Sequence, residues 1–199
     1  MILFFETVWQ DIKVTSWVEW LAVITGVSYV IFATKRMIIC WLFGIVSAAL
    51  YVYICYDFEL YLESYLQIFY VFMALYGWWK WNSDASGKKI KRWNLNRHIL
   101  TVFACSIVSI SIGYFFQNYT DQANPYIDAF TTCFSLVATY MVTTKILENW
   151  IYWVFIDIGL IALYSSRGLQ LTGILYLIYT ALAVVGFVTW YKQWKLQTK

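Results

Sequence analysis

Residues 60–81 read LYLESYLQIFYVFMALYGWWKW, and residues 169–190 read LQLTGILYLIYTALAVVGFVTW. Each stretch is long enough to cross a bilayer as a helix, which takes about 20 mostly apolar residues. A shift of 109 positions aligns the two without a gap and gives identities at Tyr70/Tyr179, Gly77/Gly186, Trp81/Trp190 and, further back, Trp41/Trp150. Shared Trp and Gly positions arise by chance less easily than shared Leu, so the sequence predicts an internal repeat.

The composition of the whole chain indicates an integral membrane protein. Its 199 residues are 62% hydrophobic, 22% aromatic and only 13% charged. A soluble fold of this size has too little interior to bury so much apolar surface. The composition therefore excludes a soluble enzyme, a nucleic-acid-binding protein and a disordered tail.

Seven stretches qualify as membrane-spanning helices, which makes the predicted fold all-α. They cover about residues 17–34, 38–56, 61–80, 98–117, 127–144, 147–165 and 171–191. Residues 1–16 lack the basic start of a signal peptide and place apolar side chains on one helical face, so they predict a short interfacial helix. The expected organisation is this N-terminal segment, a three-helix repeat at 17–81, a linker at 82–126, a second repeat at 127–191 and a tail at 192–199. The linker comprises a basic loop, a helix at about 98–117 and an outer loop.

The distribution of basic residues predicts the orientation. Of the 14 Lys and Arg residues, all but Lys13 and Arg167 fall on one side of the predicted spans. Basic residues stay on the cytoplasmic side, so the N-terminus is expected outside and the C-terminus inside. The fourth span returns the chain across the bilayer and makes the two triplets parallel, a 3+1+3 plan that the SWEET sugar carriers use. In such a plan a substrate site lies near the midplane, between the triplets.

Two carboxylates, Glu63 and Asp157, fall inside predicted spans, where a charge costs at least about 2.5–3.5 kcal/mol. Each shares a helical stripe with other polar and aromatic residues. The stripe on the third span carries Glu63, Gln67 and Tyr70, and the stripe on the sixth carries Asn149, Trp150, Trp153, Asp157 and Tyr164. These residues are the candidate substrate site. The simpler alternative is a protonated or hydrogen-bonded contact between helices.

The aromatic and glycine residues have structural explanations of their own. Trp and Tyr gather at both bilayer interfaces, so Trp41, Trp150, Trp78, Trp79, Trp81 and Trp190 are interpreted as interfacial anchors. Trp153 lies a turn deeper and is expected to stack on a ligand. Further candidates for substrate contact are Trp41, Thr172, Tyr176 and Tyr179, of which Thr172 and Tyr176 replace Glu63 and Gln67 in the second repeat. Gly44, Gly77, Gly159 and Gly186 permit close helix packing.

Several kinds of site are not expected. No Lys or Arg lies in the middle of a span, which disfavours a phosphorylated substrate, whereas carboxylates and aromatic faces favour a neutral or cationic one. The four cysteines, Cys40, Cys55, Cys105 and Cys133, are scattered and are interpreted as packing residues rather than a zinc site or disulfides. No cofactor is expected, and no catalytic motif such as HExxH is present.

The sequence resembles the PnuC family of bacterial nicotinamide riboside transporters. The resemblance covers about residues 17–194 and rests on five motifs: Trp41-x-x-Gly44, Glu63-Ser-Tyr-Leu-Gln67-Ile-Phe-Tyr70, Tyr76-Gly77-Trp78-Trp79-x-Trp81, Asn149-Trp150-x-x-Trp153-x-x-x-Asp157, and Leu175-Tyr176 with Gly186-x-x-x-Trp190. It implies uptake of nicotinamide riboside through the bacterial inner membrane for NAD biosynthesis. It also implies a SWEET-like seven-helix fold, a homotrimer, and facilitated diffusion with trapping by a cytoplasmic nicotinamide riboside kinase.

That substrate suits the residues. The pyridinium ring is cationic, which fits Trp153 and a carboxylate, and the ribose hydroxyls fit the amides of Gln67 and Asn149. The alternatives are a carrier of the same plan for a sugar or another vitamin such as thiamine or riboflavin, including a proton-coupled one. An intramembrane enzyme or a membrane scaffold is a more distant alternative.

Overall fold

The computed structural model describes residues 2–57, 61–83, 89–120, 124–166 and 170–198, and it is helical throughout these ranges apart from short connections. The helices are α1 (Ile2–Val14), α2 (Trp17–Thr34), α3 (Cys40–Asp57), α4 (Tyr61–Ser83), α5 (Leu95–Tyr119), α6 (Pro125–Thr143), α7 (Asn149–Ser166) and α8 (Gln170–Gln197). The predicted all-α class is confirmed. Every predicted span coincides with a helix, although α8 continues to Gln197, past its predicted end at residue 191.

Four of these helices, α2, α3, α5 and α8, are long and apolar enough to cross a membrane by length and composition. The other three long helices, α4, α6 and α7, have at least 18 residues each but do not meet the same criteria of composition. Of these three, α4 carries Glu63 and Gln67, and α7 carries Asn149 and Asp157. A helix whose polar residues face protein instead of lipid can be less apolar than one that faces lipid.

The helix ends follow local sequence signals. Ser16 caps α2 in a capping box: its hydroxyl accepts from the Glu19 N–H at 3.2 Å, and the Glu19 carboxylate accepts from the Ser16 N–H at 2.6 Å. Asn94 caps α5 by accepting from the Arg97 N–H, and Pro125 opens α6, where a missing N–H costs nothing.

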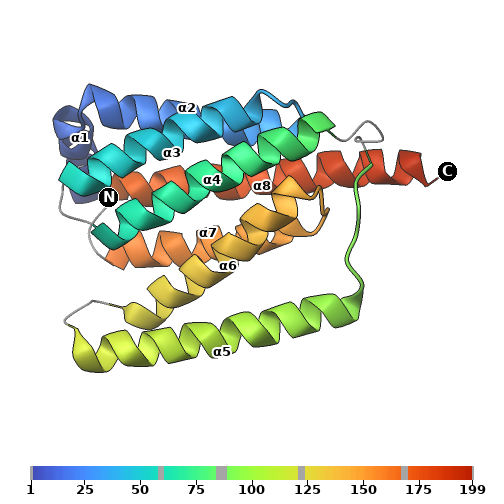
Figure 1. Cartoon of the computed structure of the whole chain (residues 1–199). Coiled ribbons are helices and arrows are strands. Elements are labelled where there is room, and N and C mark those ends of the chain that lie inside the picture. The colour runs from blue at the N-terminus through green and yellow to red at the C-terminus, as the bar shows by residue number, and fades with distance from the viewer. Residues whose placement is uncertain (1, 58–60, 84–88, 121–123, 167–169, 199) are drawn as a thin grey trace.

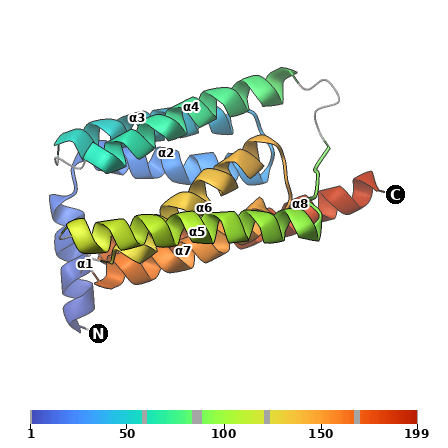
Figure 2. The same cartoon turned by 60° about the horizontal axis from the view of Figure 1, so that its bottom comes forward.

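Helices α2–α5, α7 and α8 run roughly along the long axis of the molecule, α6 is tilted across them, and α1 lies at one end of this bundle at a steep angle (Figure 1, Figure 2). Helices α2, α3 and α4 pack on one another in chain order and form the first half; α6, α7 and α8 do the same and form the second half. The halves meet through α2 against α8 and α4 against α6, while α5 packs against α6. Each half therefore uses its first and third helices to contact the other.

The two halves repeat the same local geometry at the 109-residue shift. Arg36 and Lys145, each two residues past the end of α2 or α6, have φ of 55° and 57°, a left-handed conformation unusual for a residue with a side chain. In both turns the following N–H groups bind back to the helix, from Met37 to the Phe32 carbonyl at 3.0 Å and from Ile146 to the Met141 carbonyl at 2.9 Å. Corresponding residues thus adopt corresponding conformations, which supports the predicted repeat.

The tryptophan cluster, formed by Trp41, Trp81, Trp150 and Trp190, joins the halves at the end where α4 and α8 finish. Within each half one indole meets the edge of another, with ring centroids 5.2 Å apart for Trp41 and Trp81 and 5.4 Å for Trp150 and Trp190. The third helix of each half then donates across the boundary: the Trp81 indole N–H binds the Thr143 carbonyl at 3.0 Å, and that of Trp190 lies 3.1 Å from the Thr34 carbonyl.

The interpretation of these four tryptophans as interfacial anchors is wrong. Their exposed fractions are 1% for Trp41, 8% for Trp81, 3% for Trp150 and 0% for Trp190. The repeat packs them in the protein interior, where the N–H groups of Trp81 and Trp190 bind carbonyl partners. Of the tryptophans interpreted as anchors, Trp79 is 63% exposed, as expected of an anchor. The interpretation of Gly77 and Gly186 is confirmed, since a Cβ on either would strike the ring of Trp41 or Trp150.

We expect Gly186→Ala to destabilise the protein, because its methyl group would lie 2.6 Å from the Trp150 ring. Overpacking of this kind costs about 1–3 kcal/mol in the free energy of unfolding. Thermal unfolding in detergent should show a lower Tm. Ala181→Val, which adds bulk at an exposed position of the same helix, is the control and should leave Tm almost unchanged. An unaltered Tm for Gly186→Ala would contradict the close packing.

Candidate functional site

Asp157 is the most deeply buried carboxylate of the described helices, with 3% of its surface exposed on α7. It interacts electrostatically with the hydroxyls of Tyr176 and Tyr179 on α8. Burial of an acidic group at mid-helix is costly in a bilayer unless partners or a polar ligand face it. Asp157 and two of the further candidates for substrate contact, Tyr176 and Tyr179, are therefore spatial neighbours.

A group of tyrosines surrounds this neighbourhood, and both halves contribute to it. We call Tyr51, Tyr70, Tyr164, Tyr176 and Tyr179 the tyrosine cluster. Tyr164 stacks on Tyr176 with centroids 5.4 Å apart and an interplanar angle of 10°, and Tyr176 meets Tyr179 edge-on at 5.9 Å. From the first half, Tyr51 on α3 lies near Tyr164 and Tyr179, and Tyr70 on α4 lies near Tyr164.

Tyr70 and Tyr179, which correspond in the repeat, both reach across the boundary between the halves. The Tyr70 hydroxyl lies 2.7 Å from the Ser135 hydroxyl on α6. The Tyr179 hydroxyl lies over Gly26 on α2, so close that a Cβ there would be 2.6 Å from the oxygen. Gly26 is the counterpart of Ser135 at the 109-residue shift. Tyr70 is thus fixed by the hydroxyl of Ser135, while Tyr179 occupies the space that Gly26 leaves because it has no side chain.

Asn149 and Trp150 lie at the other end of the same helix, beside the tryptophan cluster. Asn149 is 0% exposed, and its amide N–H donates to the Ile146 carbonyl at 2.6 Å. Within the described part of the chain, its Oδ1 atom and the indole N–H groups of Trp41 and Trp150 are buried and have no hydrogen-bond partner. Buried polar atoms without partners are rare, so these three atoms mark a place where a polar ligand could bind.

The remaining candidates occupy intermediate positions. Trp153 is half-buried and packs against both hydrophobic clusters of the protein, between Trp150 and Asp157 along α7. Gln67 and Thr172 are half-buried on α4 and α8. Glu63 belongs to the first turn of α4, but its side chain lies outside the described residues. Its predicted role stays a prediction.

The candidates on α7 cannot all contact one small ligand at once. Asp157 follows Asn149 by eight residues, or about 12 Å of helix, and Tyr164 lies about 10 Å further on. The structure therefore groups them into a central part around Trp153 and Asp157, one end at Asn149 and Trp150, and another end at Tyr164 and Tyr176.

Sequence reasoning missed Tyr51, Ser135 and Gly26. Only the repeat could have indicated Gly26 and Ser135, because they occupy equivalent positions opposite the matched tyrosines Tyr179 and Tyr70. Tyr51 has no such signal, since its counterpart at the 109-residue shift is Leu160.

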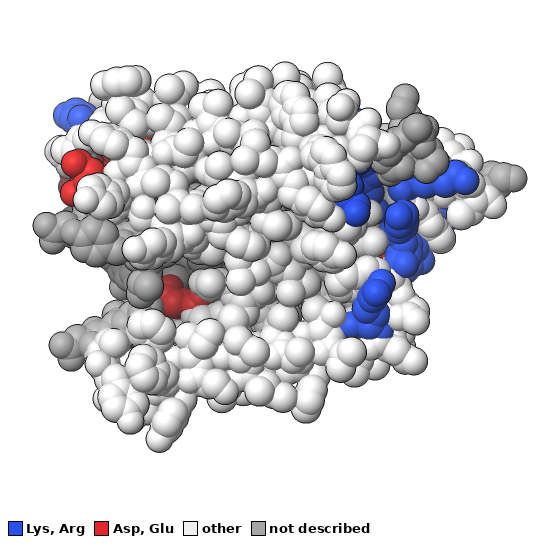
Figure 3. Space-filling model, in the orientation of Figure 1, with Lys and Arg blue, Asp and Glu red and all other residues white. Residues whose placement is uncertain are grey.

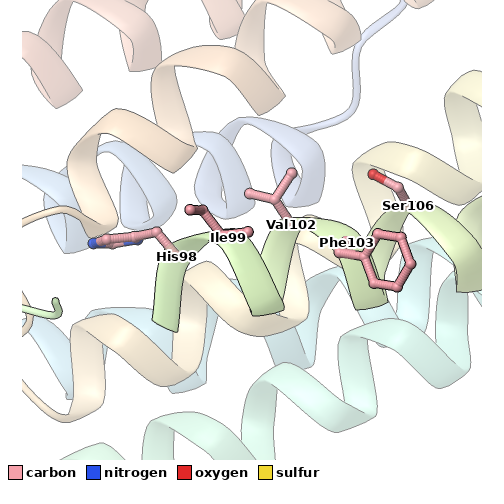
Figure 4. A pocket seen from close by; sticks show the side chains of 5 residues that line it. All are labelled: His98, Ile99, Val102, Phe103 and Ser106. Atoms are coloured by element: carbon pink, nitrogen blue, oxygen red, sulfur yellow. The ribbon is translucent and has the colours of Figure 1, made fainter. Parts of the chain in front are cut away.

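Two surface hollows lie elsewhere, along α5. One, of about 430 Å³, is wide open and lined by His98, Ile99, Val102, Phe103 and Ser106 (Figure 4). The other, of about 220 Å³, lies between α5 and α6 and is lined mainly by apolar side chains such as Tyr126 and Phe130. Neither contains a predicted site residue. Shallow apolar hollows on a membrane helix suit lipid or another helix better than a polar solute.

Known proteins resemble this chain over nearly its whole length. A family model described as "Nicotinamide mononucleotide transporter" matches residues 16–192. The "Nicotinamide riboside transporter PnuC" of Neisseria mucosa is 30% identical over 192 residues, which cover 89% of this chain and 73% of that protein. The PnuC of Escherichia coli K12 is 25% identical over 203 residues, with 88% and 85% covered.

A solved structure and a more distant relative extend the comparison. The "Crystal structure of the Vitamin B3 transporter PnuC" matches with a TM-score of 0.73 and 26% identity over 98% of this chain and 91% of that one. The "Riboflavin/roseoflavin transporter RibM" of Streptomyces davaonensis is 27% identical over 125 residues, or 60% of this chain and 59% of its own. The chain belongs to the PnuC family, and it is a multi-pass bacterial membrane transporter and not an enzyme.

Proposed function

We propose that this transporter carries nicotinamide riboside across the inner membrane. The observation that carries the proposal is Asp157: a carboxylate 3% exposed, near Tyr176 and Tyr179 of the tyrosine cluster, in a chain whose relatives are named for nicotinamide riboside. A pyridinium cation complements a buried carboxylate and is attracted to aromatic faces. The ring would lie at Trp153 and Asp157.

The ribose and carboxamide need both donors and acceptors. Gln67 on the first half and Asn149 on the second supply amides, and the free Oδ1 of Asn149 is an acceptor without a partner in the described structure. The indole N–H groups of Trp41 and Trp150 are buried donors that likewise have no hydrogen-bond partner in the described structure. Glu63, Tyr70 and Tyr164 would complete the walls of the passage, with Thr172, Tyr176 and Tyr179 on the last helix.

The riboside suits the charge distribution better than the mononucleotide of the family description. Among the described residues, the central turns of α2 to α8 contain no Lys or Arg that could neutralise a phosphate. Lys145 is buried, but it lies at the end of the bundle with its ammonium 5.1 Å from the centre of the Trp81 ring.

The proposed mechanism is facilitated diffusion by alternating access. In a 3+1+3 arrangement the first half (α2–α4) and the second half (α6–α8) would rock against each other, with α5 as the linking span. The matched contacts of α2 with α8 and α4 with α6 support this arrangement. Phosphorylation by a cytoplasmic nicotinamide riboside kinase would trap the transported riboside inside the cell. The family resemblance favours a homotrimer.

The orientation proposed is N-terminus outside and C-terminus in the cytoplasm. Basic residues gather at the end of the molecule where α4 and α8 finish and α5 begins, on the right of Figure 3. Lys13 of α1 lies at the opposite end, while Arg167 lies outside the described residues. Basic residues of membrane proteins remain in the cytoplasm, so this end would face inward.

Riboflavin is the second candidate substrate, because the RibM relative is named for it. Purified protein in liposomes should take up labelled nicotinamide riboside with saturation, down its gradient, and without a pH gradient. Unlabelled riboside should compete, whereas riboflavin, thiamine and glucose should not. Competition by riboflavin alone would favour the second candidate, and absence of saturable uptake of either compound would contradict both.

Asp157→Asn should reduce the preference for a cationic ring. The amide keeps the shape of the side chain but removes its charge, and one charge-assisted contact is worth about tenfold in affinity. The measurement compares uptake of nicotinamide riboside with that of its dihydro form, whose ring is neutral. We expect the preference of the wild type for the cation to fall about tenfold in the variant.

Two matched variants control this comparison. Asp57→Asn makes the same change at an exposed carboxylate at the end of α3 and should leave the preference unaltered. Trp153→Ala should lower uptake of both substrates, whereas Trp79→Ala, at a 63% exposed ring, should not. Wild-type behaviour of both Asp157→Asn and Trp153→Ala would reject the proposed site.

A further inference from the structure

A short extended segment at the basic end, residues 89–93, precedes α5 and binds the second half. The Lys91 N–H donates to the Lys145 carbonyl at 2.9 Å, and the Lys91 carbonyl accepts from the Leu147 N–H at 2.9 Å. The Ile90 N–H donates to the side-chain oxygen of Gln197 at the end of α8. We call residues 89–93 the strap. It attaches to the turn between α6 and α7 and to the last turn of α8.

Glu148, the residue just before α7, provides the side-chain anchor for the strap. Its carboxylate accepts from the Arg92 Nε at 2.6 Å and from the Trp93 main-chain N–H at 3.3 Å. The carboxylate side chain is only 9% exposed, while that of Arg92 is 49% exposed. The Glu148 carbonyl also accepts the first main-chain bonds of α7, from Ile151 and Tyr152.

A second contact holds α7 one turn further along. The Tyr152 hydroxyl lies 3.0 Å from His98 Nδ1 on α5, and the same imidazole has its other nitrogen 4.0 Å from Glu148. Residues 148 and 152 are four apart and therefore lie on one face of the helix. Two contacts on one face, both from the strap and the start of α5, fix the rotation of α7 about its axis.

That rotation decides where the binding residues point. Asn149, Trp153 and Asp157 form the neighbouring stripe of α7. One residue corresponds to a rotation of about 100° about the helix axis, so this stripe lies about 100° from the face that carries Glu148 and Tyr152. The first half has no equivalent anchor in its sequence: Ile39 and Phe43 occupy the positions that correspond to Glu148 and Tyr152. The two turns otherwise have matching main-chain geometry.

We propose that Glu148 and Tyr152 are positioning residues, which orient the Asn149–Trp153–Asp157 stripe through the strap and make the second half the fixed side of the site. This role rests on the proposed nicotinamide riboside transport. Because these residues touch other protein groups and not the ligand, their loss should weaken substrate binding without abolishing movement of the protein.

The test measures KM and maximal rate of nicotinamide riboside uptake in liposomes for Glu148→Gln and Tyr152→Phe, each normalised to correctly inserted protein. We expect KM to rise at least about fivefold in each variant, because coupling between two sites changes affinity by at least about fivefold. The maximal rate should stay within about twofold of wild type. Tyr152→Phe removes only one hydroxyl and keeps the ring, so it serves even if Glu148→Gln assembles poorly.

A double-mutant cycle distinguishes a specific pair from general damage. If Arg92 acts through Glu148, the variant carrying both Arg92→Gln and Glu148→Gln should have the same KM as Glu148→Gln alone. The KM of Arg92→Lys, which keeps the positive charge, should be closer to the wild-type KM than that of Arg92→Gln. Lys35→Gln, which changes one exposed charge at the same end of the first half, is the control and should not alter KM.

The outcomes separate the two proposals. Unchanged KM in both Glu148→Gln and Tyr152→Phe, with or without a lower Tm, would overturn the positioning role and leave riboside transport standing. Equal losses of maximal rate without a change in KM would overturn it too. A wild-type protein that shows no saturable riboside uptake would contradict the proposed function, and the positioning role would fall with it.

Discussion

The two cross-boundary indole bonds are the constraint on which the arrangement of the halves depends. Trp81 and Trp190 each donate to a carbonyl at the end of the opposite half's first helix, and each is buried. The last carbonyls of a helix have no partner within it, and in a dry interior such groups need one. One side chain therefore satisfies a helix end and joins two halves, and the repeat provides this contact twice. Separating the halves at this end would break both bonds together.

The halves share this frame, but they differ at several positions of the candidate site. Ser135 fixes Tyr70, whereas Gly26 leaves room for Tyr179. Asp157 and Asn149 stand where the first half has Ala48 and Cys40. The pairs that pack at the tryptophan cluster, Trp41/Trp150, Trp81/Trp190 and Gly77/Gly186, are retained by the repeat. A repeat of this kind keeps the residues that fit the halves together and is free to vary those that face the ligand.

The sequence allowed the helices and their order to be predicted because each is a stretch of about 18 to 20 mostly apolar residues bounded by short polar turns. It also indicated Asp157, since a carboxylate inside an apolar span is rare. It failed for Trp81 and Trp190, because the same residue at the same depth can face lipid or a neighbouring helix, and only the packing of the third helix decides. Glu148 was missed for a similar reason. It lies at a span boundary, where a charge costs little, and its partner Arg92 is far away in sequence.

The length of the α7 stripe has a consequence for transport. From Asn149 to Tyr164 it extends about 22 Å along the helix, which is most of the hydrocarbon thickness of about 30 Å. A nucleoside cannot touch both ends, so it would meet these residues in succession: the tyrosine cluster, then Trp153 and Asp157, then Asn149 and Trp150 beside the tryptophan cluster. Both halves contribute to the first group, whereas the last group lies beside the two indole bonds that join the halves. Under the proposed alternating access, passage to the basic end would require those bonds to break, and the strap would keep α7 oriented while the first half moves.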